Sequence, residues 1–227
     1  MWGDVTPAER LRAVTRRHLD DDRLAVEAAG ALAGFAAEPA SLVVACRQLL
    51  AHHCSNGALW WVCARILAAP EPERAAREAA QLLDADRTAD RLGATLPLLD
   101  EGEVVAVVGW PEIVDTALVE RFDVDAVAIR VDGADPTSAL RHRHSDHNVR
   151  VVDPWDPALA RVAVLIVAAS AIGADRALVP AGTRAALDEI AGAARQVWMT
   201  GGVGRVLPAR LYEVVGRSKG LVDPKEC

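Results

Sequence analysis

One stretch of the sequence decides the fold: Ala163-Val-Leu-Ile-Val-Ala-Ala-Ser-Ala-Ile-Gly173. It is apolar without alternation and rich in branched side chains, as is typical of a strand that is buried on both faces of a parallel sheet. Small residues end the stretch, among them Ser170 and Gly173, so a ligand or another backbone segment can approach closely there. The stretch therefore predicts a buried parallel strand with a binding edge at its carboxyl end.

Two later segments complete a unit around this strand. In Val179-Pro-Ala-Gly-Thr183, the final threonine is a candidate N-cap for a helix over residues 184–194. In Gln196-Val-Trp-Met-Thr-Gly-Gly-Val-Gly-Arg205, residues 197–200 predict the next buried strand, and glycines follow it. A strand, a helix and a second strand form a βαβ unit, and its right-handed crossover places both loops on the same edge of the sheet.

These segments resemble the C-terminal core of the translation initiation factor 2B α/β/δ-subunit family, which includes methylthioribose-1-phosphate and ribose-1,5-bisphosphate isomerases. The family has a strand ending in Gly-Ala-Asp-Ala-Ile, then Asn-Lys-x-Gly-Thr opening a helix, then a strand and a Leu-Pro start to the last helix. The matching positions here are 164–173, Ala181-Gly-Thr183 and Val206-Leu-Pro208. The resemblance implies a ribose-phosphate isomerase/CoA-transferase-like fold and pairing of two copies through this domain.

The rest of the chain predicts an α/β protein with a helical lobe in front of the sheet. Apolar residues three and four positions apart, punctuated by prolines and capping residues, predict helices over 7–19, 23–35, 42–50, 56–68, 73–83 and 88–99. Short apolar runs then predict strands over 104–108, 126–131, 149–152, 164–168 and 197–200, with helices over 112–121, 137–142 and 184–194 between them. This alternation is typical of a Rossmann-like, doubly wound, mainly parallel sheet. We expect the helical lobe over 1–99, the α/β domain over 100–217 and a tail over 218–227.

Composition narrows the range of partners. A formal net charge of −7 argues against nucleic acid as the main partner, because phosphate backbones require a concentrated basic face. No apolar run reaches membrane-spanning length, and we expect neither a signal peptide nor a membrane anchor. The four cysteines, Cys46, Cys54, Cys63 and Cys227, form no CxxC pair, so we expect a reduced, cytoplasmic protein.

Both catalytic positions of the isomerases differ in this chain. The resemblance places a cysteine after the first sheet strand and an aspartate at the end of the Gly-Ala-Asp strand; Gly109-Trp110-Pro111 and Ser170 stand there instead. A 1,2-proton shift needs an acid and a base with pKa values tuned near neutrality, which a serine hydroxyl does not supply. A similar cysteine segment, Cys54-Ser-Asn-Gly57, lies too early in the chain, where we expect Asn56 or Ser55 to cap a helix.

We therefore expect a member that binds a phosphorylated small molecule, a sugar phosphate or a nucleotide, without the isomerase residues. Helix-start N–H groups at Gly182 and Thr183, with an exposed Arg205 from the glycine-rich loop, predict the anion site; the alternative is a tight turn without a ligand. An isomerase that uses other residues, and a non-catalytic homodimeric interaction or regulatory subunit, remain alternative functions. The other candidate ligand-binding residues stand at or just beyond the predicted strand ends: Gly109, Trp110, Arg130, Asp153, Ser170, Gly173 and Gly202.

One further motif, His142-Arg-His-Ser-Asp-His147, matches the HxHxDH zinc signature of the metallo-β-lactamase superfamily. That motif should follow a hydrophobic strand, whereas residues 134–141 predict a polar turn and a short helix. No histidine follows His147, so the downstream ligands of such a site are missing. We expect a solvated helix end here, and neither a metal nor a cofactor.

Overall fold

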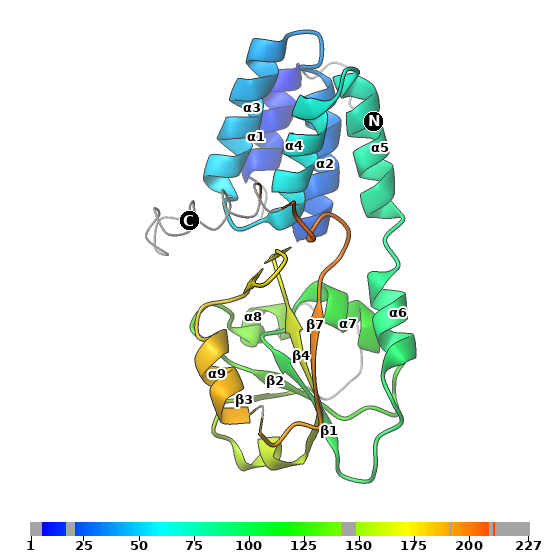
Figure 1. The fold of residues 1–227 in the computed structure, drawn as a ribbon, viewed down its shortest axis with the longest axis vertical. Helices are drawn as coiled ribbons and strands as arrows, with labels where there is room; N and C mark the ends of the chain where they lie inside the picture. Colours follow the sequence, from blue (N-terminus) through cyan, green and yellow to red (C-terminus); the bar gives the residue numbers. More distant parts are fainter. Residues whose placement is uncertain (1–5, 17–20, 142–148, 191, 209–210, 212–227) are drawn as a thin grey trace. The chain divides into compact units, whose positions relative to one another are not determined.

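The computed structural model describes residues 6–16, 21–141, 149–190, 192–208 and 211 (Figure 1). The chain forms two compact units. A helical unit takes the described parts of Met1–Asp86, Ser170–Ala177 and Gly202–Cys227, and a sheet unit takes those of Arg87–Ala169 and Leu178–Gly201. The chain therefore returns to the helical unit after entering the sheet unit, whereas the sequence led us to expect two contiguous lobes.

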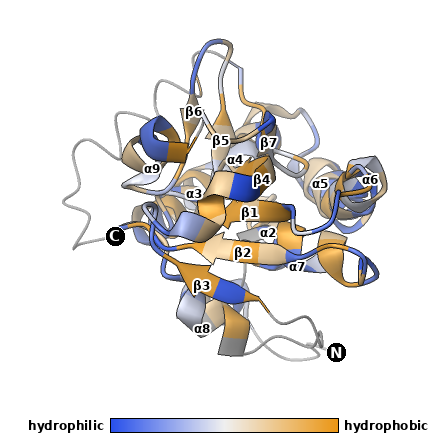
Figure 2. Cartoon of the chain, turned by 90° about the horizontal axis from the view of Figure 1, so that it is seen from below, coloured by the Kyte–Doolittle hydropathy of each residue, from blue (hydrophilic) through white to orange (hydrophobic). Residues whose placement is uncertain are grey.

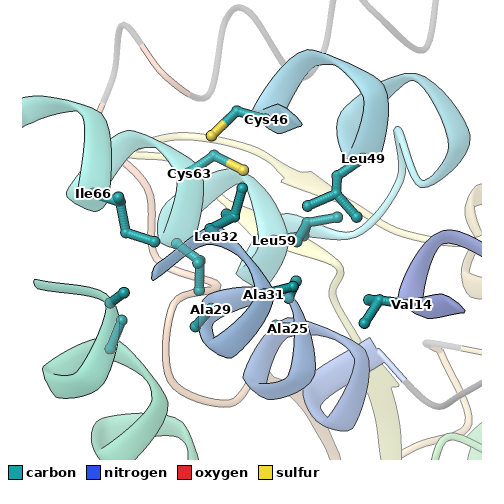
Figure 3. Packing of buried hydrophobic residues seen from close by; sticks show 14 of the residues in the cluster. Val14, Ala25, Ala29, Ala31, Leu32, Cys46, Leu49, Leu59, Cys63 and Ile66 are labelled. Atoms are coloured by element: carbon teal, nitrogen blue, oxygen red, sulfur yellow. The ribbon is translucent and has the colours of Figure 1, made fainter. Parts of the chain in front are cut away.

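The helical unit is built on helices whose apolar faces share one core. In order they are α1 (Pro7–Arg16), α2 (Asp21–Ala33), α3 (Pro39–His52), α4 (Gly57–Ala68) and α5 (Pro72–Asp84). Small side chains of α2, such as Ala25 and Ala29, allow close approach, and Leu59 and Ile66 of α4 fill the space between helices (Figure 3). The predicted helical N-terminal region is confirmed, although the helical unit leaves the N-terminal part of the chain at Asp86 rather than at residue 99.

The sheet unit contains a five-stranded parallel sheet in the order β3-β2-β1-β4-β7. The strands are β1 (Val104–Val108), β2 (Ala126–Ile129), β3 (Arg150–Val152), β4 (Val162–Ala168) and β7 (Gln196–Thr200). Strand β4 lies between β1 and β7 and is buried along all but its last residue, as its unbroken apolar run predicts. The order reverses between β1 and β4, and in such folds ligands bind outside the carboxyl ends of the strands at this point.

Helices cover both faces of this sheet. Helices α6 (Thr88–Thr95) and α7 (Glu112–Leu118) lie on one face and α9 (Thr183–Ile190) on the other, while α8 (Pro136–Arg141) follows β2 (Figure 1). Alternate residues of β1 therefore enter different cores: Val105 and Val107 pack with α6 and α7, and Ala106 and Val108 with α9. Strands β1 and β2 are accordingly hydrophobic along their length (Figure 2). The predicted α/β class with a doubly wound parallel sheet is confirmed.

Helix α6 ends four residues before the predicted boundary at residue 99. Pro97 disfavours helical geometry in the residue before it, and Leu96 is extended with ψ 126°. The guanidinium of Arg121 binds carbonyl groups at this helix end, donating to Gly93 O at 2.6 Å and Leu96 O at 3.0 Å. The same guanidinium forms an ion pair with Asp123, and its hydrogen bond to the Asp123 carboxyl group is the main cause that lowers the pKa of Asp123.

The chain beyond β4 forms a short hairpin that the sequence did not predict, β5 (Ala171–Ile172) with β6 (Ala177–Leu178). Gly173 N donates to Arg176 O at 2.8 Å and closes its turn. Strands of two residues are too short to leave a period-2 pattern in the sequence.

Glycine at position 57 lets the start of α4 lie against the backbone beyond β4. A Cβ atom built on Gly57 would stand 1.9 Å from the carbonyl oxygen of Ser170. The preceding residue, Asn56, accepts a hydrogen bond from Leu59 N at 2.9 Å, which confirms the predicted helix cap. The Cys54-Ser-Asn-Gly57 segment therefore starts a helix.

We expect Gly57→Ala to lower the free energy of unfolding by about 2–3 kcal/mol, because backbone rather than a flexible side chain must move. Gly30→Ala is the matched control, since a Cβ there meets nothing within 4 Å inside α2. It should raise the free energy of unfolding by about 0.5–1 kcal/mol through helix propensity. Denaturant unfolding of both variants measures the difference, and equal effects would contradict the close packing at Gly57.

Candidate functional site

The predicted ligand edge brings together residues that follow three neighbouring parallel strands. Gly109 follows β1, Arg130 follows β2 and Asp153 follows β3. Arg130 Nη1 lies 3.1 Å from Asp153 Oδ1, and Arg130 Nε lies 3.8 Å from Asp135 Oδ1. The side chains of Arg130, Asp153 and Asp135 are 48%, 44% and 63% exposed. A guanidinium with solvent-facing surface thus stands at the carboxyl edge of the sheet, where it can contact a polar ligand.

Gly109 and Trp110 shape the turn after β1. Gly109 has φ +66°, and a Cβ there would lie 2.8 Å from the Ala134 side chain, so glycine meets two constraints at once. Trp110 is buried in the core shared with α6 and α7, and its Nε1 donates to Asp115 Oδ1 at 2.8 Å. These contacts give Trp110 a structural role in this core, and its binding of a ligand stays a prediction.

Thr183 is the most unusual polar residue of the sheet unit. It is the first residue of α9 and has no exposed surface, and its Oγ1 has no hydrogen-bond partner within the described part of the chain. Its predicted role as N-cap is wrong, because Ala186 N donates to Gly182 O, one residue earlier. A buried hydroxyl without a partner costs roughly 1–3 kcal/mol. No sequence pattern distinguishes such a hydroxyl from an ordinary cap.

The glycine at position 182 lets the loop before α9 pack closely against residues 131 and 132. Its φ is +83°, and a Cβ there would stand 3.0 Å from Asp132 N and 3.3 Å from Val131 Cβ. The start of α9 therefore lies directly against the backbone that follows Arg130. Because α9 follows β4 and precedes β7, its N-terminus stands at the carboxyl edge of the parallel strands.

The arginine of the glycine-rich loop at 201–205 was predicted to be exposed, but it is buried. Arg205 is only 6% exposed. Its Nη2 lies 2.7 Å from Asp22 Oδ1, and its Nη1 lies 3.4 Å from Asn56 Oδ1. Val203 N donates to Asp86 Oδ2 at 2.7 Å. The expectation of an exposed Arg205 is wrong, because carboxylates of the chain itself already bind this loop.

The two halves of the predicted anion site belong to different units. Gly182 and Thr183 lie in the sheet unit, whereas Gly202 and Arg205 lie in the helical unit. Their convergence on one ligand stays a prediction. Gly202 has a local reason to be glycine, since a Cβ there would stand 2.6 Å from Asp86 Oδ2.

The remaining candidate residues also lie in the helical unit. Ser170 is half-buried, and its backbone lies beneath Gly57; Gly173 belongs to the turn of the β5–β6 hairpin. Among the described residues, no group of three or more histidine, cysteine or acidic side chains is arranged to hold a metal ion. The His142-Arg-His-Ser-Asp-His147 motif lies outside the described residues.

The cysteines depart in part from the expected reduced state. Cys46 and Cys63 are free thiols in the core of the helical unit, whereas Cys54 is disulfide-bonded. Where the structure describes the chain, its helices are all too short or too polar to cross a bilayer.

Sequence reasoning missed an open groove of about 380 Å³ on the sheet unit. It runs between α6 and the outer strand β7 and is lined by Thr88, Arg91, Leu92, Thr95, Trp198, Met199 and Thr200. Its lining combines Arg91 and three threonines with the largely apolar side chains of Leu92, Trp198 and Met199.

Comparisons with known proteins identify the fold. The chain superposes on eIF2B beta from Chaetomium thermophilum with a TM-score of 0.64 and 17% identity, covering 90% of this chain and 78% of that chain. The tetrameric eIF2B-beta2-delta2 complex from C. thermophilum matches with a TM-score of 0.61 and 17% identity, over 88% of this chain and 78% of the other. The chain also superposes on eIF2B delta from the same organism with a TM-score of 0.57 and 14% identity, covering 84% of this chain and 86% of that chain.

The chain has the fold of the eIF2B beta and delta subunits. No protein-family profile matches the sequence. No curated protein sequence matches it either. The fold implied by the sequence resemblance is therefore confirmed at the level of three-dimensional structure.

We expect Arg205→Ala to lower the free energy of unfolding by about 1–3 kcal/mol, because it leaves Asn56 and Asp22 without their charged partner. Arg184→Ala removes an arginine whose side chain is 89% exposed and whose ion-pair partner among the described residues is Asp188 of the same helix. That control should change the free energy by no more than about 0.5 kcal/mol. Urea denaturation tests both, and an unchanged midpoint for Arg205→Ala would contradict its structural role.

Proposed function

We propose that this chain is an initiation factor 2B-like protein that binds a phosphorylated small molecule, a sugar phosphate or a nucleotide, without isomerase chemistry. The fold shared with eIF2B subunits supports the first part of the proposal. The observation that carries the second part is the buried, unpaired hydroxyl of Thr183 at the start of α9. As part of the same proposal, the protein acts in the cytoplasm.

The chemistry at Thr183 suits a phosphate oxygen. The hydroxyl can donate, and the positive end of a helix macrodipole favours negative charge. Because its Oγ1 is already removed from water, a new hydrogen bond there has no further desolvation cost to offset. Since Thr183 is fully covered, the ligand has to displace part of the preceding loop, and only a ligand that prefers the open loop can drive that change.

Arg130 is the cation that would complete this site within the sheet unit. It precedes Val131 and Asp132, the residues against which Gly182 packs. Its half-exposed guanidinium already spans Asp153 and Asp135, so a phosphate would compete with one of these carboxylates. Arg205, by contrast, would have to leave Asp22 before it could bind a ligand.

The part of the proposal that excludes isomerase chemistry rests on the side chains at the two strand ends. Gly109 and Trp110 follow β1, and Ser170 follows β4, so neither position offers an acid or base near neutrality. Incubation with ribose 1,5-bisphosphate, followed by NMR, should show binding shifts without conversion to a ketose. Turnover would favour the alternative, an isomerase that uses other residues.

We also propose that two copies pair through the sheet unit. Its outer strand β7 exposes Val197 at 48% and Met199 at 56%, an apolar strip that a second copy would cover. One solved protein of this fold is a tetrameric complex of eIF2B beta and delta.

The ligand proposal predicts opposite effects of Thr183→Val on stability and on binding. Replacing an unpaired buried hydroxyl by a methyl group should raise the free energy of unfolding of the ligand-free protein by about 1 kcal/mol. The same change should weaken binding of a sugar phosphate about tenfold, measured by calorimetry. Thr95→Val is the control, because its exposed Oγ1 donates to Arg91 O in α6; it should leave affinity unchanged. Equal affinity of Thr183→Val and the native protein would overturn this site.

The dimer proposal predicts a twofold mass by light scattering at about tens of micromolar, a range in which moderate interfaces are occupied. Met199→Glu should shift the protein towards monomer, because it buries a charge in the apolar strip. Leu82→Glu alters an equally apolar residue, 44% exposed, in α5 of the helical unit and should leave the mass unchanged. A monomeric native protein at these concentrations would refute pairing.

A further inference from the structure

Two cysteine side chains meet in the core of the helical unit. Cys46 comes from α3 and Cys63 from α4, and they are 1% and 2% exposed. Both thiols are free, and their side chains lie next to each other (Figure 3). Leucine, isoleucine and alanine side chains make up most of the surrounding core. Neither the fold resemblance nor the proposed ligand site uses this pair.

The interaction between the two side chains makes the thiols unequal. Hydrogen bonding with Cys63 lowers the pKa of Cys46, against the opposing effect of burial. The same interaction, followed by burial and by the nearby charge once Cys46 ionises, raises the pKa of Cys63. Cys46 is therefore the sulfur that ionises first, and the thiolate is the form that reacts with oxidants. Cys63 stands in contact with it as a resolving thiol.

We propose that Cys46 and Cys63 are a redox modification site that forms a reversible disulfide between α3 and α4 when the protein meets a peroxide. In the first step the Cys46 thiolate attacks a peroxide oxygen; an S–O bond forms, the O–O bond breaks, and hydroxide leaves. Cys63 then attacks the sulfenic sulfur; an S–S bond forms, the S–O bond breaks, and the Cys63 proton leaves with the hydroxyl group as water. Two thiols are oxidised, and one peroxide is reduced to two waters.

Burial sets the rate of this reaction and its selectivity. Only a small oxidant can reach sulfur atoms that are 1–2% exposed, and local opening between α3 and α4 has to admit it. Once Cys46 is oxidised, the contacting Cys63 thiol should react before a second peroxide arrives. The product closes a loop between residues 46 and 63, which restricts the unfolded chain and stabilises the helical unit.

The test treats the folded protein with hydrogen peroxide, blocks remaining thiols with N-ethylmaleimide and maps tryptic peptides by mass spectrometry. Trypsin places Cys46 in peptide 24–47 and both Cys54 and Cys63 in peptide 48–65. The experiment therefore uses Cys54→Ala, in which a link between these peptides can only join Cys46 to Cys63. We expect that link as the main oxidised product, reversed by dithiothreitol. Sulfinic or sulfonic acid at Cys46, without the link, would overturn the proposal.

Two further variants separate disulfide formation from general oxidation. Cys63→Ala should give no link and should accumulate over-oxidised Cys46, and Cys46→Ala should leave Cys63 largely unreacted with peroxide. The linked form of Cys54→Ala should melt about 6–12 °C above its reduced form, as expected for a loop of this length in a protein of this size. If the linked and reduced forms melt at the same temperature, or if Cys46→Ala oxidises at Cys63 as fast as the parent, the proposed site is wrong.

Discussion

A buried guanidinium determines how the chain returns to its helical unit. Arg205 lies in a segment that follows the last strand of the sheet, yet its charge is bound by Asp22 of α2, 183 positions earlier, and by Asn56, the cap of α4. Its carbonyl oxygen accepts from Ile172 N at 2.7 Å, which ties the segment to β5 as well. Because an unpaired charge at this depth would be costly, these partners have to be in place together. The ion pair therefore joins stretches of chain that have no local reason to meet.

This internal pairing also affects where an external anion can bind. A loop rich in glycine, with free N–H groups and an arginine, is a suitable phosphate cradle when nothing else occupies it. Here Asp86 accepts from Val203 N, and Asp22 binds Arg205. An incoming phosphate would have to displace two carboxylates that are attached to the protein and already desolvated in part. In the sheet unit, by contrast, the buried hydroxyl of Thr183 offers unused bonding capacity.

How far the sequence predicts this protein depends on whether a feature is local. Strand β1 was predicted at its observed ends, and β4 within two residues, because burial on both faces leaves an unbroken apolar run. The cap at Asn56 could also be predicted, because its hydrogen-bond partner lies only three residues away in the sequence. The burial of Arg205 was not, because a guanidinium and a carboxylate 183 positions apart leave no pattern. Thr183 has the residue type and position of a cap, and only the structure shows its hydroxyl unpaired.

The fold by itself does not imply the chemistry of the isomerases. A parallel sheet brings its strand ends to one edge, but a reaction needs particular side chains there. After β4 this chain has Ser170, whose carbonyl oxygen lies so close to Gly57 that a single Cβ atom would not fit between them. The backbone at a position that resembles a catalytic one is thus used for packing against α4. The packing of α4 therefore constrains the backbone at this strand end, whatever side chain position 170 carries.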